Sequence, residues 1–373
     1  MKKCRVLELI GGSLSDGGAE TLVKEYVLHL DNQRFESAVF VDWVIPGTAN
    51  YKMLTEAGET IFTVYPRYNP FWRGINKFLR GFLFQRKLKK VVRDFNPDVI
   101  HVHLFALEYL SKLGDVLTGR RILYTCHSTP DAIFGDSPLE EKAAGVLVKD
   151  HGLRFIALHK QMAEELNSRF GVKNTVVVNN GIDISRFKNV AENKISIRES
   201  LGIPKDAFVI GHVGRFSAEK NHEQILKVFE SVREVNDKAF LLLVGAGERR
   251  SEIEEEIKGK GIDRYSLILS GRNDIHMILK AMDVFLFPSI YEGLGIALIE
   301  AQASGLRCIV SDTVPPDAFV SDNVVALDLN APVVKWRDAV LDTALKGKFL
   351  NRIHEYDINS TVHKLEQLYL EEI

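Results

Sequence analysis

The feature that most constrains the fold is an alternation of short apolar segments with amphipathic segments along nearly the whole chain. The apolar segments are rich in Val, Ile and Leu, as expected of strands buried on both faces. Such strands joined by helices indicate parallel sheets with helices on both sides. The predicted strands are residues 6–10, 37–41, 60–64, 99–102, 121–126, 155–158 and 175–178, and then 208–213, 239–244, 267–269, 284–287 and 308–311.

The alternation breaks once, in a polar stretch from Lys188 to Glu199, and then starts again. The chain has 373 residues, more than the ~100–200 typical of one domain. We therefore expect an α/β protein of two Rossmann-like, doubly wound parallel-sheet domains, residues 1–187 and 188–353. Ligands of such sheets bind beyond the carboxyl ends of the strands, so the loops that follow strands are the candidate sites.

Composition excludes several classes of protein. With 48 Lys+Arg and 50 Asp+Glu, the net charge is −2, which argues against a globally basic nucleic-acid binder. The three cysteines are scattered and form no CxxC pair, so neither a disulfide framework nor a zinc site is expected and a reducing cytoplasm is favoured. No apolar run approaches the ~18 residues that span a bilayer. The apolar residues 6–10 are too few for a signal peptide and are better explained as a buried strand.

The strongest local signal is the loop after the strand at 284–287. Glu292-Gly-Leu-Gly295 leads into a predicted helix that contains Glu300. Free amides at a glycine turn and helix start bind anions. Two carboxylates eight residues apart, roughly 12 Å along a helix, suit the two ends of an extended ligand with a phosphate between them. The alternative is an ordinary loop carboxylate and a solvated helix residue.

A second loop follows the strand at 208–213 and holds Gly214, Arg215 and Lys220. Arginine offers a planar fork to phosphate oxygens and lysine a point charge, so the two can neutralise a diphosphate leaving group. Ordinary surface cations are the alternative. Because both flank one loop in the same half of the chain as Glu292, we favour a binding function.

In the N-terminal half, a glycine-rich loop containing Gly17 and Gly18 joins the first strand to the first helix without matching GxGxxG. His127 follows the strand at 121–126 and could hydrogen-bond a bound polar group, or be purely structural. His101 and His103 carry less weight. We find no Asp-x-Asp motif, so we expect no metal ion, and no Walker, GxSxG or HExxH motif.

Four motifs, in this order along the chain, resemble those of the retaining family 4 glycosyltransferases of GT-B fold, the type that builds exopolysaccharide, capsule and O-antigen. They are GGAE at 17–20, VVNNGID at 177–183, GRFSAEKN at 214–221, and EGLG followed by ALIEAQASG at 292–305. The last is similar to the family's E-x7-E signature. The resemblance extends over essentially the whole chain.

The resemblance implies roles for these residues. Arg215 and Lys220 would hold the nucleotide diphosphate, helped by the amides of Gly293, Leu294 and Gly295. Gly17 and Gly18 would face the diphosphate, and Gly214 would be a further donor-binding residue. Glu292 and His127 would lie at the transferred sugar, Glu300 at the ribose, and the backbone around Arg272 and Asn273 at the base. Residues 354–373, apolar at helical spacing, would pack back on the first domain.

The activity implied is retaining, metal-independent transfer of a hexose or N-acetylhexosamine from a UDP-sugar to a saccharide or lipid-linked saccharide. No cofactor is expected beyond the donor substrate, and no nucleic-acid partner. Two other functions stay open: a GT-B sugar-nucleotide epimerase or phosphorylase, and a non-catalytic nucleotide-sugar-binding protein.

Between Thr60 and Arg93 the chain has many cations and aromatic residues but no Asp or Glu. A basic amphipathic helix suits an anionic membrane surface, although a solvated helix covering the sheet has the same pattern. We expect a cytoplasmic protein bound peripherally to the inner leaflet of the cell membrane. The candidate contact residues are Arg73, Lys77, Arg80, Arg86, Lys87, Lys89 and Lys90.

Overall fold

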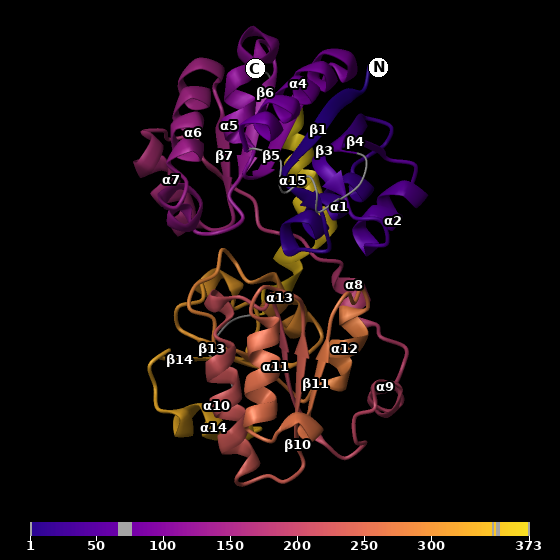
Figure 1. The fold of residues 1–373 in the computed structure, drawn as a ribbon, viewed down its shortest axis with the longest axis vertical. Coiled ribbons are helices and arrows are strands. Elements are labelled where there is room, and N and C mark those ends of the chain that lie inside the picture. The colour runs from indigo at the N-terminus through magenta and orange to yellow at the C-terminus, as the bar shows by residue number, and fades with distance from the viewer. Residues whose placement is uncertain (1, 66–76, 345–346, 348–350, 372–373) are drawn as a thin grey trace. The chain divides into compact units, whose positions relative to one another are not determined.

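The computed structural model describes residues 2–65, 77–344, 347 and 351–371. They form two compact α/β units (Figure 1), the first Met1–Gly181 with Ile358–Ile373 and the second Ile182–Asp357. These limits differ by a few residues from the expected 187/188 and 353/354. Helix α8 (Ile184–Lys188) packs on other helices of the second unit, and the Ile182 amide donates to the Tyr356 carbonyl at 2.8 Å.

The sheet of the first unit is parallel and, in the described residues, has eight strands. Their spatial order is β2-β3-β1-β5-β6-β7-β8, with β4 beside β3 on the other side from β1. The short β2 was not predicted from the sequence. The strands are β1 (Cys4–Gly11), β2 (Ser13–Leu14), β3 (Phe35–Val44), β4 (Thr60–Tyr65), β5 (Val99–Leu104), β6 (Arg121–Thr125), β7 (Arg154–Ala157) and β8 (Val176–Val177).

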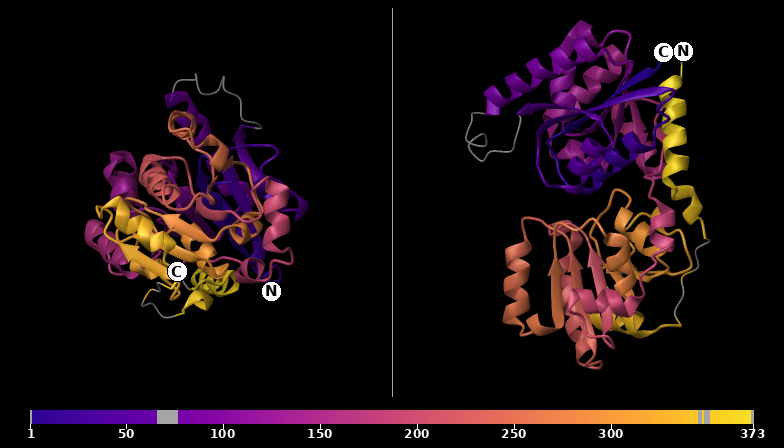
Figure 2. Two further views of the ribbon diagram at one scale, coloured as in Figure 1. Left: turned by 90° about the horizontal axis from the view of Figure 1, so that it is seen from below. Right: turned by 90° about the vertical axis from the view of Figure 1, so that its right-hand side faces the viewer.

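Helices lie on both faces of this sheet (Figures 1 and 2). The last helix of the chain packs on β1 and on the first helix, so the end of the sequence completes the first unit. The helices are α1 (Gly18–His29), α2 (Ala49–Glu56), α4 (Lys77–Phe95), α5 (Leu107–Leu110), α6 (Pro138–His151), α7 (Lys160–Phe170) and α15 (Ile358–Leu370).

The second unit contains a parallel sheet in the order β11-β10-β9-β12-β13-β14. In order along the chain this is 3-2-1-4-5-6, the arrangement of doubly wound nucleotide-binding folds. The strands are β9 (Phe208–Val213), β10 (Ala239–Val244), β11 (Ser266–Leu269), β12 (Val284–Phe287), β13 (Arg307–Ser311) and β14 (Val324–Leu327). The helices, besides α8, are α9 (Lys194–Leu201), α10 (His222–Arg233), α11 (Arg250–Gly259), α12 (Ile275–Ala281), α13 (Ile296–Ala303) and α14 (Val333–Leu341).

The sequence pattern explains these elements. Every residue of β10 is buried, which accounts for its unbroken apolar run. Helix α10 turns Ile225, Phe229 and Val232 inward, at helical spacing, onto the same core. Strand β14 was missed from the sequence because it lies at the edge of the sheet, where its side chains are not continuously buried.

Each sheet reverses its winding once, between β1 and β5 in the first unit and between β9 and β12 in the second. At such a switch point the connections on either side leave in opposite directions, which opens a crevice at the carboxyl ends of the strands. The topology therefore singles out the loops after β1, β5, β9 and β12.

Candidate active site

The switch point of the second unit brings two predicted loops together. Residues 214–221 follow β9 and residues 288–295 follow β12. The Ile290 amide donates to the Glu219 carbonyl at 2.7 Å, and the Asn221 Nδ2 donates to the Pro288 carbonyl at 3.2 Å. Asn221 has φ 54°, a left-handed conformation that asparagine tolerates, and α10 starts at the next residue. These bonds hold the two loops as one surface.

Glu292 and Lys220 form a direct pair in this surface. The Lys220 Nζ donates to Glu292 Oε1 at 2.5 Å, and the Ser289 hydroxyl donates to the same oxygen at 2.7 Å. The lysine ammonium also lies 5.5 Å from the centre of the buried Phe287 ring. The Lys220 and Glu292 side chains are 16% and 8% exposed, so both charges are largely desolvated. Each charge therefore needs the other to offset the free-energy cost of its burial. The sequence predicted both residues but not their pairing.

Arg215 differs from Lys220 in its surroundings. Its side chain is 68% exposed and its guanidinium pairs with the Glu248 carboxylate at 3.1 Å. An exposed pair of this kind contributes only about 0–1 kcal/mol to stability. Arg215 can therefore exchange Glu248 for a phosphate at small cost.

The glycine turn before α13 presents backbone rather than side chains. Gly295 has φ 86°, and Leu294 is buried, so its contribution to a ligand would come from its amide. Helix α13 begins at Ile296, which puts Glu292 in the loop and half-buried Glu300 inside the helix. The arrangement offers a helix N-terminus between the two predicted carboxylates, as an anion site requires.

Three residues of this region were missed by sequence reasoning: Gly245, Gly247 and Ser289. The Gly214 amide donates to the Val244 carbonyl, and the Phe216 amide donates to the Ala246 carbonyl. The loop after β10 therefore packs against the loop after β9. A Cβ at Gly245 would lie 1.9 Å from the Gly214 carbonyl oxygen. The run Gly245-Ala-Gly247 directly after a fully buried strand was the available signal.

Gly214 is confined as well, since a Cβ there would lie 2.7 Å from His212 Nε2.

The remaining predicted donor residues follow β11. The Arg272 Nε donates to Asp274 Oδ1 at 2.8 Å, and the Asn273 carbonyl accepts from Arg186 Nη2 at 2.6 Å. The first contact joins two side chains of the loop, and the second fixes its backbone at Asn273.

In the first unit, Gly17 precedes α1 and Gly18 is its first residue. The Ser15 hydroxyl binds the Glu20 carboxylate at 2.8 Å and accepts from the Gly17 amide at 3.3 Å. A Cβ at Gly17 would lie 2.5 Å from Glu20 Oε2, whereas one at Gly18 meets no described atom within 4 Å. Glu20 therefore folds back over the loop and leaves Gly18 open.

His127 lies just beyond the end of β6. Its Nε2 is 2.8 Å from His103 Nδ1. Its Nδ1 is buried and has no hydrogen-bond partner among the described residues. Burial, together with the neighbouring His103, holds the pKa of His127 well below its usual range, so the ring is neutral at pH 7. A neutral ring with one unused nitrogen can bind a ligand group.

The basic helix α4 has two distinct faces. Phe84, Leu88, Val91 and Val92 are buried. Arg86, Lys87 and Lys90 are exposed and Lys89 is half-buried. Of the other predicted contact residues, Arg73 lies outside the described residues, as do the side chains of Lys77 and Arg80. No helix within the described ranges is long and apolar enough to cross a membrane.

Two doubly wound sheets, with glycine-containing charged loops after β9 and β12, are the features expected of a protein that binds a sugar nucleotide. Two family models match the chain: Glycosyltransferase Family 4 over residues 16–186, and Glycosyl transferases group 1 over residues 193–355. The chain belongs to the family 4 glycosyltransferases and has the GT-B fold.

Sequence relatives and solved structures agree with this family and this fold. The glycosyltransferase EpsF of Bacillus subtilis is 26% identical over 92% of this chain and 88% of its own. An Escherichia coli UDP-Gal:alpha-D-GlcNAc-diphosphoundecaprenol alpha-1,3-galactosyltransferase is 28% identical over 76% of this chain and 78% of its own. Anabaena HepE, solved with UDP-glucose, superposes with a TM-score of 0.76 at 17% identity, covering 97% of this chain and 98% of that one.

Proposed function

We propose that this glycosyltransferase moves a hexose or N-acetylhexosamine from a UDP-sugar to a saccharide or lipid-linked saccharide, with retention of the anomeric configuration. The observation that carries the proposal is the desolvated Lys220–Glu292 pair beside the glycine turn of α13. The complex of HepE with UDP-glucose and the UDP-Gal substrate of the Escherichia coli relative support a uridine nucleotide.

Each part of the donor would be bound by a different set of residues. Lys220 and Arg215 bind the diphosphate, together with Gly17, Gly18, Gly214 and the amides of Gly293, Leu294 and Gly295. Glu300 binds the ribose, and the backbone at Arg272 and Asn273 binds the base. Glu292 and His127 bind the transferred sugar. Because Glu292 neutralises Lys220 before the donor arrives, the site avoids a buried unpaired charge in the absence of ligand.

Retention follows from attack on the same face that the leaving group departs from. The acceptor oxygen forms a bond to the anomeric carbon as the bond from that carbon to the diphosphate breaks. The acceptor proton passes to the departing phosphate oxygen. The cations and the amides before α13 stabilise the negative charge that develops on this phosphate.

A thermal-shift panel of nucleotide sugars tests the donor. A UDP-sugar is expected to stabilise the protein by about 2.7 kcal/mol at 100 times its Kd, because it binds only the folded state. GDP-sugars and NAD serve as the comparison and are expected to leave the unfolding midpoint unchanged. Stabilisation by NAD alone would contradict the proposal, and NMR of the product anomer tests retention.

We also propose that α4 docks on an anionic membrane, where a lipid-linked acceptor would be found. Each cation near such a surface contributes about 1 kcal/mol. Changing Arg86, Lys87 and Lys90 to glutamine should therefore weaken binding to anionic liposomes on the order of 100-fold. Co-flotation with the vesicles measures this.

The control for flotation is a variant with the same loss of charge elsewhere. Lys142, Lys149 and Lys160 lie in α6 and α7 and are also exposed. Changing these three to glutamine should leave flotation unaltered. Equal recovery of the wild type with neutral and anionic vesicles would count against membrane docking.

A further inference from the structure

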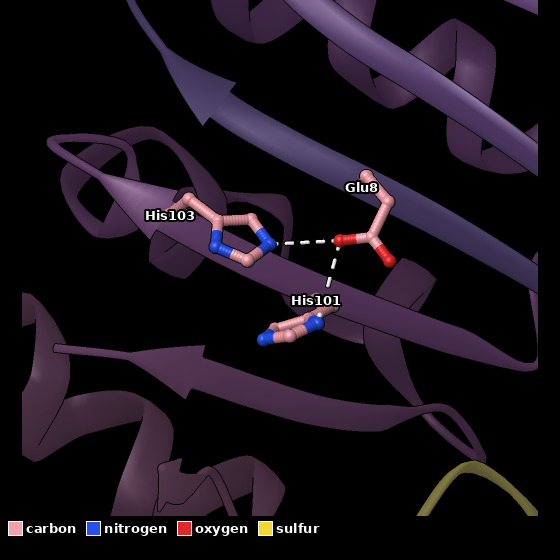
Figure 3. Close-up of side chains that lie close together, drawn as sticks. All are labelled: Glu8, His101 and His103. Atoms are coloured by element: carbon pink, nitrogen blue, oxygen red, sulfur yellow. Dashed lines mark hydrogen bonds and ion pairs between the residues drawn. The ribbon is translucent and has the colours of Figure 1, made fainter. Parts of the chain in front are cut away.

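A buried polar chain crosses the switch point of the first unit and ends at His127. Figure 3 shows Glu8 of β1 beside His101 and His103 of β5, all three fully buried. Glu8 Oε2 lies 2.7 Å from His103 Nε2, and His103 Nδ1 lies 2.8 Å from His127 Nε2. Glu8, His103 and His127 thus form a continuous hydrogen-bonded path from the interior of the sheet to its carboxyl edge.

Glu8 determines where the protons of this path lie. Burial alone would raise the pKa of its carboxyl, but the attraction of His101 and hydrogen bonds from both histidines lower the pKa to about 2. An ionised carboxylate can only accept hydrogen bonds. It accepts one from the Tyr369 hydroxyl of α15 at 3.0 Å, through Oε1, and one from His103 through Oε2, which also lies 3.3 Å from His101 Nδ1. His103 therefore carries its proton on Nε2.

The next bond follows from the neutrality of His103. Burial, together with His101, lowers the pKa of His103 to about 4. A neutral imidazole protonated on Nε2 accepts at Nδ1, so the bond between the two rings must be donated by His127 Nε2. The Nδ1 atom of His127 is then an unprotonated acceptor, and it is the atom that lacks a partner among the described residues.

We propose that Glu8 and His103 are positioning residues that fix the tautomer of His127, so that its Nδ1 accepts a hydrogen bond from a hydroxyl group of the transferred sugar. The inference rests on the proposed function, which assigns His127 to that sugar. It adds the direction of the hydrogen bond: the bound sugar supplies the proton, and a ligand group that can only accept is rejected by the unprotonated nitrogen.

A metal ion is the competing explanation of the cluster, since ligand atoms of Glu8, His101 and His103 lie within 4.8 Å of one another. Hydrogen bonds already occupy these atoms. His101 Nδ1 lies 2.7 Å from the Tyr369 hydroxyl oxygen and His101 Nε2 lies 2.7 Å from the Thr125 hydroxyl oxygen. Because Tyr369 donates its proton to Glu8, His101 Nδ1 is the donor of the first bond. A metal would have to displace these bonds and those of His103, so we favour the hydrogen-bonded chain.

Imidazole 15N NMR of histidine-labelled protein at pH 7 tests the proton positions without any substrate. The signals of His127 are assigned by their loss in His127→Asn. The wild type is expected to show a protonated Nε2 and a bare Nδ1, whereas the opposite tautomer would overturn the proposal. Added EDTA should leave the spectrum unchanged, and a change would show that a metal holds the cluster.

Glu8→Gln places an amide opposite His103, where it can donate instead of accept. We expect the protonated population of His127 to shift toward Nδ1 and kcat/KM for sugar transfer to fall at least about 10-fold, the loss of one hydrogen bond. An unaltered tautomer would remove Glu8 from the chain. An altered tautomer with full activity would show that the sugar does not use Nδ1.

Thr125→Val is the matched control. Thr125 is also buried, and its hydroxyl binds His101, which is not a member of the path from Glu8 through His103 to His127. It should keep the His127 tautomer and kcat/KM within about twofold of wild type, as expected for a neutral hydrogen bond outside the chain. If the wild type transfers no sugar, the proposed function fails while the 15N spectra still decide the tautomer.

Discussion

Replacing Glu292 by glutamine is expected to reduce sugar transfer at least about 100-fold while the protein stays folded. Glutamine keeps the shape of the side chain and can still accept from Ser289 and Lys220, but it removes the charge that balances the lysine. An interaction that stabilises the transition state in a desolvated site is worth about 10²–10³ in kcat. Steady-state transfer from the UDP-sugar measures the loss.

Lys220→Met should abolish transfer to a similar degree, but it also lowers stability. It leaves the largely buried Glu292 carboxylate without its cation, which costs about 3–5 kcal/mol for a fully buried pair. The double variant Lys220→Met, Glu292→Leu replaces the pair by apolar groups and should recover most of that stability without recovering transfer. Recovery of both would show that the pair is structural only.

A control for this pair is available on the surface of the same unit. Lys238 and Asp206 form an ion pair at 2.9 Å with both side chains exposed. Because an exposed ion pair adds little to stability, Lys238→Ala is expected to leave both sugar transfer and the urea unfolding midpoint unaltered. If Lys238→Ala reduced transfer as much as Lys220→Met does, the site assignment would be wrong.

Gly245→Ala is expected to lower the free energy of unfolding by more than about 3 kcal/mol, or to prevent folding, because overpacking that cannot relax is strongly destabilising. The new methyl group would lie 1.9 Å from the Gly214 carbonyl oxygen, an atom of the backbone that cannot turn aside. Gly245 also has φ +153°, which L-residues rarely adopt. In molecules that fold, the Gly214 loop must move, so affinity for the UDP-sugar should fall as well. Urea unfolding and the thermal-shift panel measure the two effects.

Gly271→Ala separates crowding from backbone strain. Gly271 follows the neighbouring strand β11 and has φ +64°, but a Cβ there meets no described atom within 4 Å. Only the left-handed backbone is then penalised, at about 1–2 kcal/mol. Equal losses of stability in the two variants would mean that the contact with Gly214 does not constrain the loop.

The contrast between Glu292 and Glu8 shows how far the sequence led to the candidate site. Glu292 stands beside glycines at a strand end, so its surroundings along the chain suggested a ligand. Glu8 stands inside an apolar strand and gave no such sign. The signals that could have revealed it were a carboxylate among apolar residues and two histidines, His101 and His103, at the two-residue spacing that places them on one face of a strand.

The sequence by itself determined the fold class, and it singled out the strand-end loops on which the proposed function rests. Hydrophobic periodicity and glycine turns are local properties, because they depend only on residues that are close together in the sequence. The order of the four motifs along the chain also indicated the family.

Only the tertiary structure decided which charges meet. Lys220 reaches Glu292, and Tyr369 reaches Glu8, because a doubly wound sheet places strands side by side that are far apart in the chain. Whether a cation lies exposed like Arg215 or desolvated like Lys220 depends on the same packing. Burial and partners set the strength of a charge, and neither is encoded by its immediate neighbours in sequence.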